Sequence, residues 1–213
     1  MAPAEVSTGR PDRRRFVALV WLGCAGATVV MALSVANTMS GFSASVSNTT
    51  NTAGTGTLIM EEDQAATTCL SSSGLISTAN AGSCATINKF GGNTAMVPGV
   101  AVITNITIKN NGSMPARSFT LTPGTCSQSA NGSPSGAATD FCAKLTVVIT
   151  SGASTVFTGT AAALAAGGAI SLAAPVAAGD SVPFSFSTTV NASVDNSYQG
   201  LLASEPLTWT FAS

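Results

Sequence analysis

The side chains best suited to chemistry in this sequence are its cysteines and a short run of carboxylates. The chain has 213 residues, with five Cys and no His. The absence of His excludes both the HExxH zinc-protease motif and a Ser-His-Asp triad. The cysteines have no CxxC spacing, so the usual ligand pattern of a structural zinc site is missing too. We therefore predict no enzyme activity, no catalytic or metal-binding residues and no cofactor.

The carboxylates do not have the spacing of a calcium loop. Residues 61–63 are Glu-Glu-Asp, whereas a calcium loop places its ligands at alternating positions around a glycine-assisted turn. Paired acids could also act as general acid and base. The remaining candidates after residue 63 fall in predicted turns: Asp140, Asp180, Asp195 and Glu205. We interpret both groups as solvated turn or loop acids.

Four cysteines, Cys69, Cys84, Cys126 and Cys142, follow the N-terminal apolar segment. An even number in an exported chain favours disulfides, and four cysteines allow three connectivities. The two near-neighbour pairings would each close a loop of about 15 residues, worth on the order of 3 kcal/mol. Both loops are rich in Ser, Gly, Ala and Asn, so each bridge would fix an excursion between strands.

The N-terminal 41 residues are typical of an export signal. Residues 1–15 form a basic n-region, residues 16–36 an uncharged h-region, and residues 37–41 a small-residue exit. An uncleaved transmembrane helix is the alternative, because 21 uncharged residues can span a bilayer. We favour cleavage, because the exit continues into a strand-like segment without a basic stop. The predicted product is secreted, extracellular or on the cell surface, and its precursor lies in the cytoplasmic membrane.

The exported part is weakly acidic. Only 8% of the chain is charged, and residues 42–213 carry four Lys or Arg against seven Asp or Glu. Scattered cations in an acidic domain do not match a phosphate backbone, so nucleic acid is not a predicted partner.

The elements that position these side chains are strands. Apolar residues alternate with polar or small ones over residues 100–109, between a Pro98-Gly99 turn and the turn-forming residues 110–112, and alternation resumes at 117–121. This pattern predicts a central hairpin. Further strands are predicted at residues 42–48, 56–60, 144–150, 155–158, 182–190 and 207–211, with one helical turn within 161–169. Residues 42–213 should therefore form one all-β domain, an antiparallel β-sandwich of jelly-roll type.

The strand predicted at residues 42–48 has one apolar face, formed by Phe42, Ala44 and Val46, and one face of serines. Signal cleavage would free this strand, and a flexible linker at residues 49–56 follows it. Such a strand can add to an open sheet edge of a neighbouring molecule. The alternative is that it pairs within its own sheet.

Three segments together resemble the TasA/camelysin family of exported bacterial proteins. The first is Phe42-Ser43 with residues 54–60. The second, residues 97–121, is a proline-glycine turn followed by a strand and an N-x-G-S/T-L-x-A hairpin. The third, residues 178–211, covers the final strands and contains an N-x-Y-Q-G element. The positions that match the last two motifs are Pro98, Gly99, Asn111, Gly112, Tyr198, Gln199 and Gly200. The sequence departs from the family pattern in lacking Asp after Phe42-Ser43, in having Ala212-Ser213 in place of the usual Gln after the last strand, and in its four cysteines.

The resemblance implies a jelly-roll subunit that polymerises with itself into extracellular fibres of a biofilm matrix by N-terminal donor-strand exchange. It also implies a signal processed by a SipW-type signal peptidase, with membrane contact only through an uncleaved N-terminal segment. One alternative is a monomeric or membrane-anchored surface binding module that uses the disulfide-pinned loops. A camelysin-like metalloprotease is disfavoured, because the sequence has no recognisable ligand set.

Overall fold

The computed structural model describes residues 17, 21, 44–72 and 80–213, and the chain divides into two units, Met1–Ala53 and Gly54–Ser213. The predicted signal segment 1–41 and Phe42 lie outside the described residues, except for Val17 and Trp21, which are helical and exposed. No helix in the described part of the chain is long and apolar enough to cross a membrane.

In the first unit, residues 44–53 form neither helix nor strand, and all of them are exposed. Val46 is fully exposed, at 101% of its reference area. The predicted strand at residues 42–48 is therefore not formed over its described part, residues 44–48. An extended segment needs a neighbouring strand to satisfy its backbone N–H and C=O groups, and alternation alone does not supply one.

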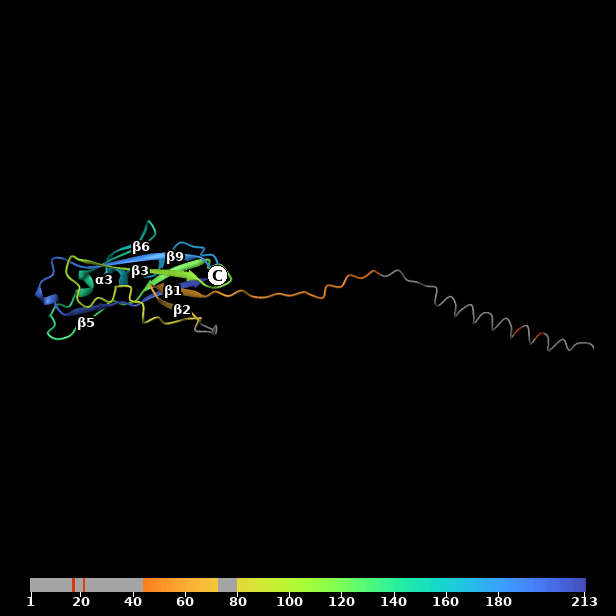
Figure 1. The fold of residues 1–213 in the computed structure, drawn as a ribbon, viewed down its shortest axis with the longest axis horizontal. Helices are drawn as coiled ribbons and strands as arrows, with labels where there is room; N and C mark the ends of the chain where they lie inside the picture. The colour runs from red at the N-terminus through yellow and green to blue at the C-terminus, as the bar shows by residue number, and fades with distance from the viewer. Residues whose placement is uncertain (1–16, 18–20, 22–43, 73–79) are drawn as a thin grey trace, which may run out of the picture. The chain divides into compact units, whose positions relative to one another are not determined.

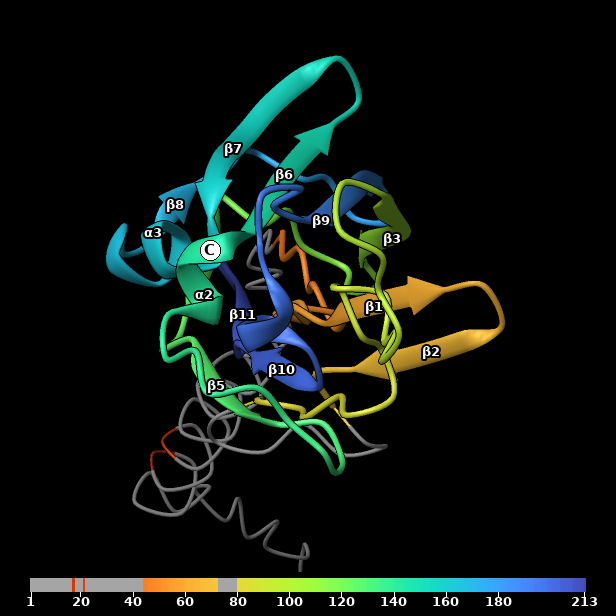
Figure 2. The same ribbon diagram turned by 90° about the vertical axis from the view of Figure 1, so that its left-hand side faces the viewer.

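The second unit is built around a six-stranded antiparallel sheet in the order β2-β1-β3-β9-β6-β7. The two longest strands, β3 and β9, lie at its centre, and the β1–β2 and β6–β7 hairpins form its two ends (Figures 1 and 2). The strands are β1 (Met60–Gln64), β2 (Thr67–Leu70), β3 (Ala101–Asn110), β6 (Leu145–Ser151), β7 (Ser154–Thr160) and β9 (Ser181–Val190).

The remaining strands form two smaller antiparallel sheets, β11-β4-β8 and β10-β5. Their strands are β4 (Ser118–Pro123), β5 (Ser127–Ala130), β8 (Ile170–Ser171), β10 (Leu201–Ser204) and β11 (Leu207–Ala212). The described helices of this unit are short: α2 (Phe141–Lys144), α3 (Ala161–Ala166) and the 3-10 turn η1 (Asn196–Tyr198). The predicted all-β antiparallel class is confirmed, and the sheets stack in the manner of a sandwich.

The core fills the space between the large sheet and the β11-β4-β8 sheet. Phe184 of β9 packs on Trp209 of β11, with ring centroids 4.7 Å apart, and Phe119 of β4 packs on Phe211 at 4.8 Å. Buried side chains on the inner faces alternate with exposed or partly buried ones along β3, β6 and β9, which is the period-2 pattern visible in the sequence. Burial of these faces supplies the main driving force for stacking the sheets.

The central strand was predicted correctly, but the predicted hairpin is wrong. β3 pairs with β1 and β9, whereas β4 pairs with β11 and β8 in the other sheet. Residues 110–117 therefore form a corner between the two layers. The fully buried Asn110 holds this corner, because its amide donates to the carbonyls of Met114 at 2.8 Å and Val176 at 3.0 Å.

Other predicted elements agree in place but differ in extent. The strands at residues 144–150, 155–158, 182–190 and 207–211 and the helical turn within 161–169 correspond to β6, β7, β9, β11 and α3. The segment predicted as a strand at 56–60 precedes the regular strand β1. It bonds irregularly to the corner, where Ser113 N donates to the Thr57 carbonyl at 2.9 Å. The excursion predicted between Cys126 and Cys142 contains the strand β5, which pairs with β10.

Candidate binding cleft

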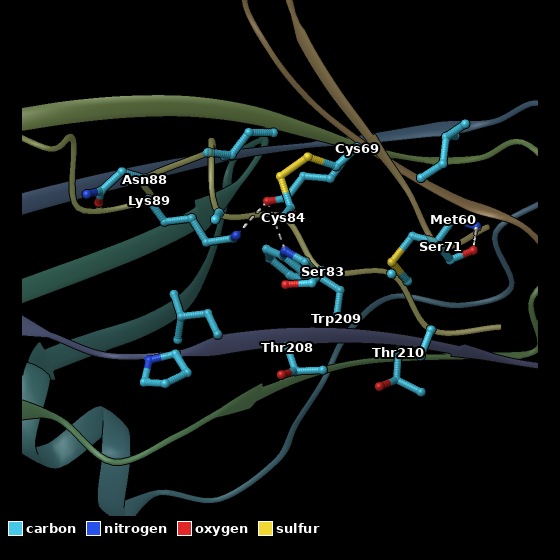
Figure 3. A pocket seen from close by; sticks show the side chains of 18 of the residues that line it. Met60, Cys69, Ser71, Ser83, Cys84, Asn88, Lys89, Thr208, Trp209 and Thr210 are labelled. Atoms are coloured by element: carbon cyan, nitrogen blue, oxygen red, sulfur yellow. Dashed lines mark hydrogen bonds and ion pairs between the residues drawn. A yellow bond between two sulfur atoms is a disulfide. The ribbon is translucent and has the colours of Figure 1, made fainter. Parts of the chain in front are cut away.

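A cleft of about 860 Å³ opens along one edge of β11. Consecutive residues 203–211 line it, including both the inward- and the outward-facing side chains of β11. Among the described strands, β11 pairs with β4 alone, on its other side, so the edge that faces the cleft has no described strand beside it. Figure 3 shows Thr208, Trp209 and Thr210 of this strand on one side, with Met60, Cys84 and Lys89 across from them. The cleft thus occupies the position that one more strand of this sheet would take.

The wall opposite β11 is formed by β1, the end of β2 and residues 80–90. Apolar side chains supply much of it, among them Leu58, Met60, Ile87 and Phe90. The Cys69–Cys84 disulfide ties β2 to the 80–90 segment within this wall. An extended segment with one apolar face would find both a hydrophobic surface and an open backbone edge here.

The disulfides follow the near-neighbour pairing. Cys69 bonds to Cys84, and Cys126 bonds to Cys142, with Cα–Cα distances of 5.8 and 6.2 Å. The second bridge links the start of β5 to α2 and does not line the cleft. One disulfide therefore shapes the cleft, and the other fixes a loop elsewhere.

The interpretation of residues 61–63 as a solvated turn is wrong, because they lie in β1. Glu62 is 7% exposed, and its Oε1 accepts from Lys89 Nζ at 2.7 Å and from Trp209 Nε1 at 3.3 Å. These two donors offset the cost of removing the carboxylate from water. Glu61 instead contacts Lys109 and Asn111, at 3.3 and 2.8 Å. No cluster of three or more His, Cys, Asp or Glu suited to a metal ion is found in the described part of the chain.

Glu205, in the turn between β10 and β11, is not a solvated acid either. Its side chain is half-buried, and both carboxylate oxygens are buried without a hydrogen-bond partner among the residues that the structure describes. Desolvation by burial raises the pKa of Glu205 from 4.5 to about 7. Glu205 lines the cleft near the start of the β11 edge.

The other turn acids are exposed, as predicted, and two of them make specific hydrogen bonds. Tyr198 Oη donates to Asp140 Oδ1 at 2.6 Å, and Lys144 Nζ lies 3.5 Å from Oδ2. The hydrogen bond from Tyr198, and then the charge of Lys144, lower the pKa of Asp140, while the bond to Asp140 raises the pKa of Tyr198 to about 12. Asp195 accepts from the backbone and hydroxyl of Ser197, which lowers its pKa.

The family-motif positions form turns, and none of them lines the cleft. Gly99 has φ of +80° and donates to the Val190 carbonyl at 2.8 Å, which starts β3 beside the end of β9. A side chain at Gly112 would collide with the backbone of Thr57 and Ile59. The remaining positions are Pro98 beside Gly99, Asn111 at the corner, Tyr198 at the end of η1, and Gln199 and Gly200 between η1 and β10.

The predicted donor-strand residues lie in the first unit. Ala44 and Val46 are exposed and outside any strand, and Phe42 falls outside the described residues. An uncharged segment of this kind and a sheet edge with no described strand beside it are two features that suit strand addition.

No protein-family model matches this chain, and no curated protein is significantly similar to it. The fold and its two disulfides define an all-β, disulfide-stapled protein suited to an oxidising, extracellular type of environment.

Proposed function

We propose that the mature chain is an extracellular structural subunit that self-assembles into fibres by strand addition. Residues 42–48 of one copy would bind along the unpaired edge of β11 in the next copy. The observation that carries this proposal is the cleft beside that edge. The motifs shared with the TasA/camelysin family, and the jelly-roll architecture that they imply, point the same way.

The chemistry of the segment suits the cleft. Phe42, Ala44 and Val46 share one face, which would pack on the apolar wall, while the segment's backbone would satisfy the open N–H and C=O groups of β11. Seven residues extended at about 3.3 Å each span about 23 Å, and the lining from Glu205 to Phe211 is equally long in residues. Neither the segment nor the linker at 49–56 carries a charged side chain, so no charged side chain must be desolvated on insertion.

Export and processing complete the proposal. A SipW-type peptidase would remove residues 1–41 and release the strand. The two disulfides would then form outside the cytoplasm, in keeping with the environment that they favour. The assembled protein would contact a membrane only if that N-terminal segment stayed attached.

Negative-stain microscopy of purified, oxidised protein tests the proposal. A chain that begins at Phe42 should form filaments, whereas a chain that begins at Gly54 should stay monomeric. Val46→Asp should abolish filaments, because it places a charge on the inserted face, and the matched control Ser47→Asp should retain them. Monomers from the folded Phe42 chain would contradict self-assembly and favour the monomeric or anchored binding module. Proteolysis that EDTA abolishes would instead favour the metalloprotease.

A further inference from the structure

The proposed function leaves the buried carboxylate of Glu205 unexplained. Both of its oxygens are buried with no partner in the described part of the chain, two residues before β11 begins. A buried carboxylate is costly to ionise unless a cation or hydrogen-bond donor meets it. Such a group on the wall of a cleft therefore favours a ligand that brings a positive charge.

The other charged residues of the cleft do not provide that charge. Among the described residues that line it, the remaining ionisable side chains are Glu62 and Lys89. These two pair with each other at 2.7 Å, and both are nearly buried, with side-chain exposures of 9% and 10%. Lys89 is thus committed to Glu62, and Glu205 is left for a group from outside the cleft.

The segment proposed to enter the cleft has one possible positive charge. Residues 42–53 contain no Lys, Arg or His. Cleavage of the signal, however, creates an α-ammonium on the first residue of the mature chain, and this group is a cation with three donors near neutral pH. A charge-assisted hydrogen bond between an ammonium and a carboxylate is among the stronger polar contacts in proteins.

We propose that Glu205 binds the α-ammonium at the N-terminus of the incoming strand from a second copy. The first residue of that strand lies beside Glu205, and the strand then runs parallel to β11 toward Phe211. This assignment rests on the proposed function and adds a recognition element to it. It makes the cleft selective for a processed chain, because an uncleaved signal has no ammonium at this position.

The test uses a peptide of residues 42–48 with either a free or an acetylated N-terminus. The receptor is the chain Gly54–Ser213, which contains every core residue of its unit. Trp209 is the only Trp of that chain and lies in the cleft, so its fluorescence reports binding. Acetylation should weaken binding by about tenfold or more. Glu205→Gln should remove the difference between the two peptides, whereas Asp180→Asn, which deletes an exposed acid, should preserve it.

The outcomes separate this inference from the proposed function. Equal binding of the two peptides overturns the role of Glu205 and leaves strand addition intact. An effect of acetylation that persists in Glu205→Gln also overturns it, because the ammonium would then bind another group. A folded receptor that binds neither peptide overturns strand addition and this inference with it.

Discussion

At the scale of single residues, the environment of each carboxylate decides its behaviour. Glu62 and Glu205 both line the cleft, and both carboxylates are removed from water. Glu62 accepts hydrogen bonds from two donors, whereas Glu205 has no donor among the described residues. Asp140 stays exposed and is held by Tyr198 and Lys144. Ion pairing therefore dominates the environment of Glu62, burial that of Glu205, and hydrogen bonding that of Asp140.

Glu205 should make stability depend on pH. The unfolded chain loses this proton near pH 4.5, whereas the folded protein keeps it up to about pH 7. Folding thus binds a proton between these values, and the free energy of unfolding should fall as the pH rises from about 4.5 to about 7. Because part of the side chain reaches solvent, we expect a fall of about 1–2 kcal/mol.

Denaturant unfolding at pH 5 and pH 8 checks this. Glu205→Gln should lose less free energy of unfolding than the wild type over that interval, whereas Asp180→Asn should behave as the wild type does. An equal fall in the wild type and in Glu205→Gln would contradict the assignment.

Tyr198 gives a second prediction at this scale. It is the only Tyr in the chain, so the absorbance of its phenolate reports its titration directly. The pKa of Tyr198 is about 12, chiefly through its hydrogen bond to Asp140. Asp140→Asn should move it down toward 10, because the charge that opposes the phenolate is gone. Asp195→Asn should move it much less, and equal effects of the two variants would contradict this order of causes.

At the scale of elements, the corner after β3 decides how the layers connect. The sequence of residues 110–112 suits a tight turn, and the structure uses it to leave one sheet and enter the other. The choice depends on what Asn110 contacts: its side-chain amide donates to the carbonyl of Met114 within the corner and to that of Val176 in the segment before β9.

Asn110→Ala should lower the free energy of unfolding by about 1–3 kcal/mol, since two carbonyls lose their donor in a buried place. The matched control is Asn111→Ala, whose exposed side chain donates to Glu61; its cost should stay below about 1 kcal/mol. Chemical denaturation measures both values. Similar costs at the two positions would show that the corner does not depend on Asn110.

At the scale of the whole molecule, the two disulfides have similar spans and different surroundings. They close 15 and 16 residues, but only Cys69–Cys84 lies in the wall of the cleft. Stability and assembly should therefore respond differently to their loss.

Replacing either pair by Ser should cost on the order of 3 kcal/mol, as loops of this length predict. Under conditions where both variants remain folded, the Cys69→Ser/Cys84→Ser chain should form few filaments, because residues 80–90 are no longer tied to β2. The Cys126→Ser/Cys142→Ser chain should assemble as the wild type does. Microscopy and light scattering compare the two, and equal loss of assembly would contradict a specific role for the cleft wall.

The sequence by itself determined the strands that became β3, β6, β9 and β11, the helical turn α3 and the all-β class. Alternation and helix-ending glycines are local signals, so they predict an element regardless of which strand it later pairs with. The short strand β5 was missed because its residues, Ser127–Ala130, are those of a loop. The inward position of Glu62 could have been predicted from the sequence, because Leu58, Met60 and Glu62 alternate and therefore lie on the same face of an extended segment.

Only the tertiary structure decided that residues 110–117 are a corner, that Glu62 meets Lys89 and Trp209, and that Glu205 is buried without a partner. These outcomes depend on contacts between residues as far apart as Glu62 and Trp209, 147 positions along the chain. The unpaired edge of β11 arises in the same way, because the number of strands beside it is a property of the assembled sheets. Local pattern fixes what a segment can become, and packing between distant segments fixes which groups face water, a partner or an open cleft.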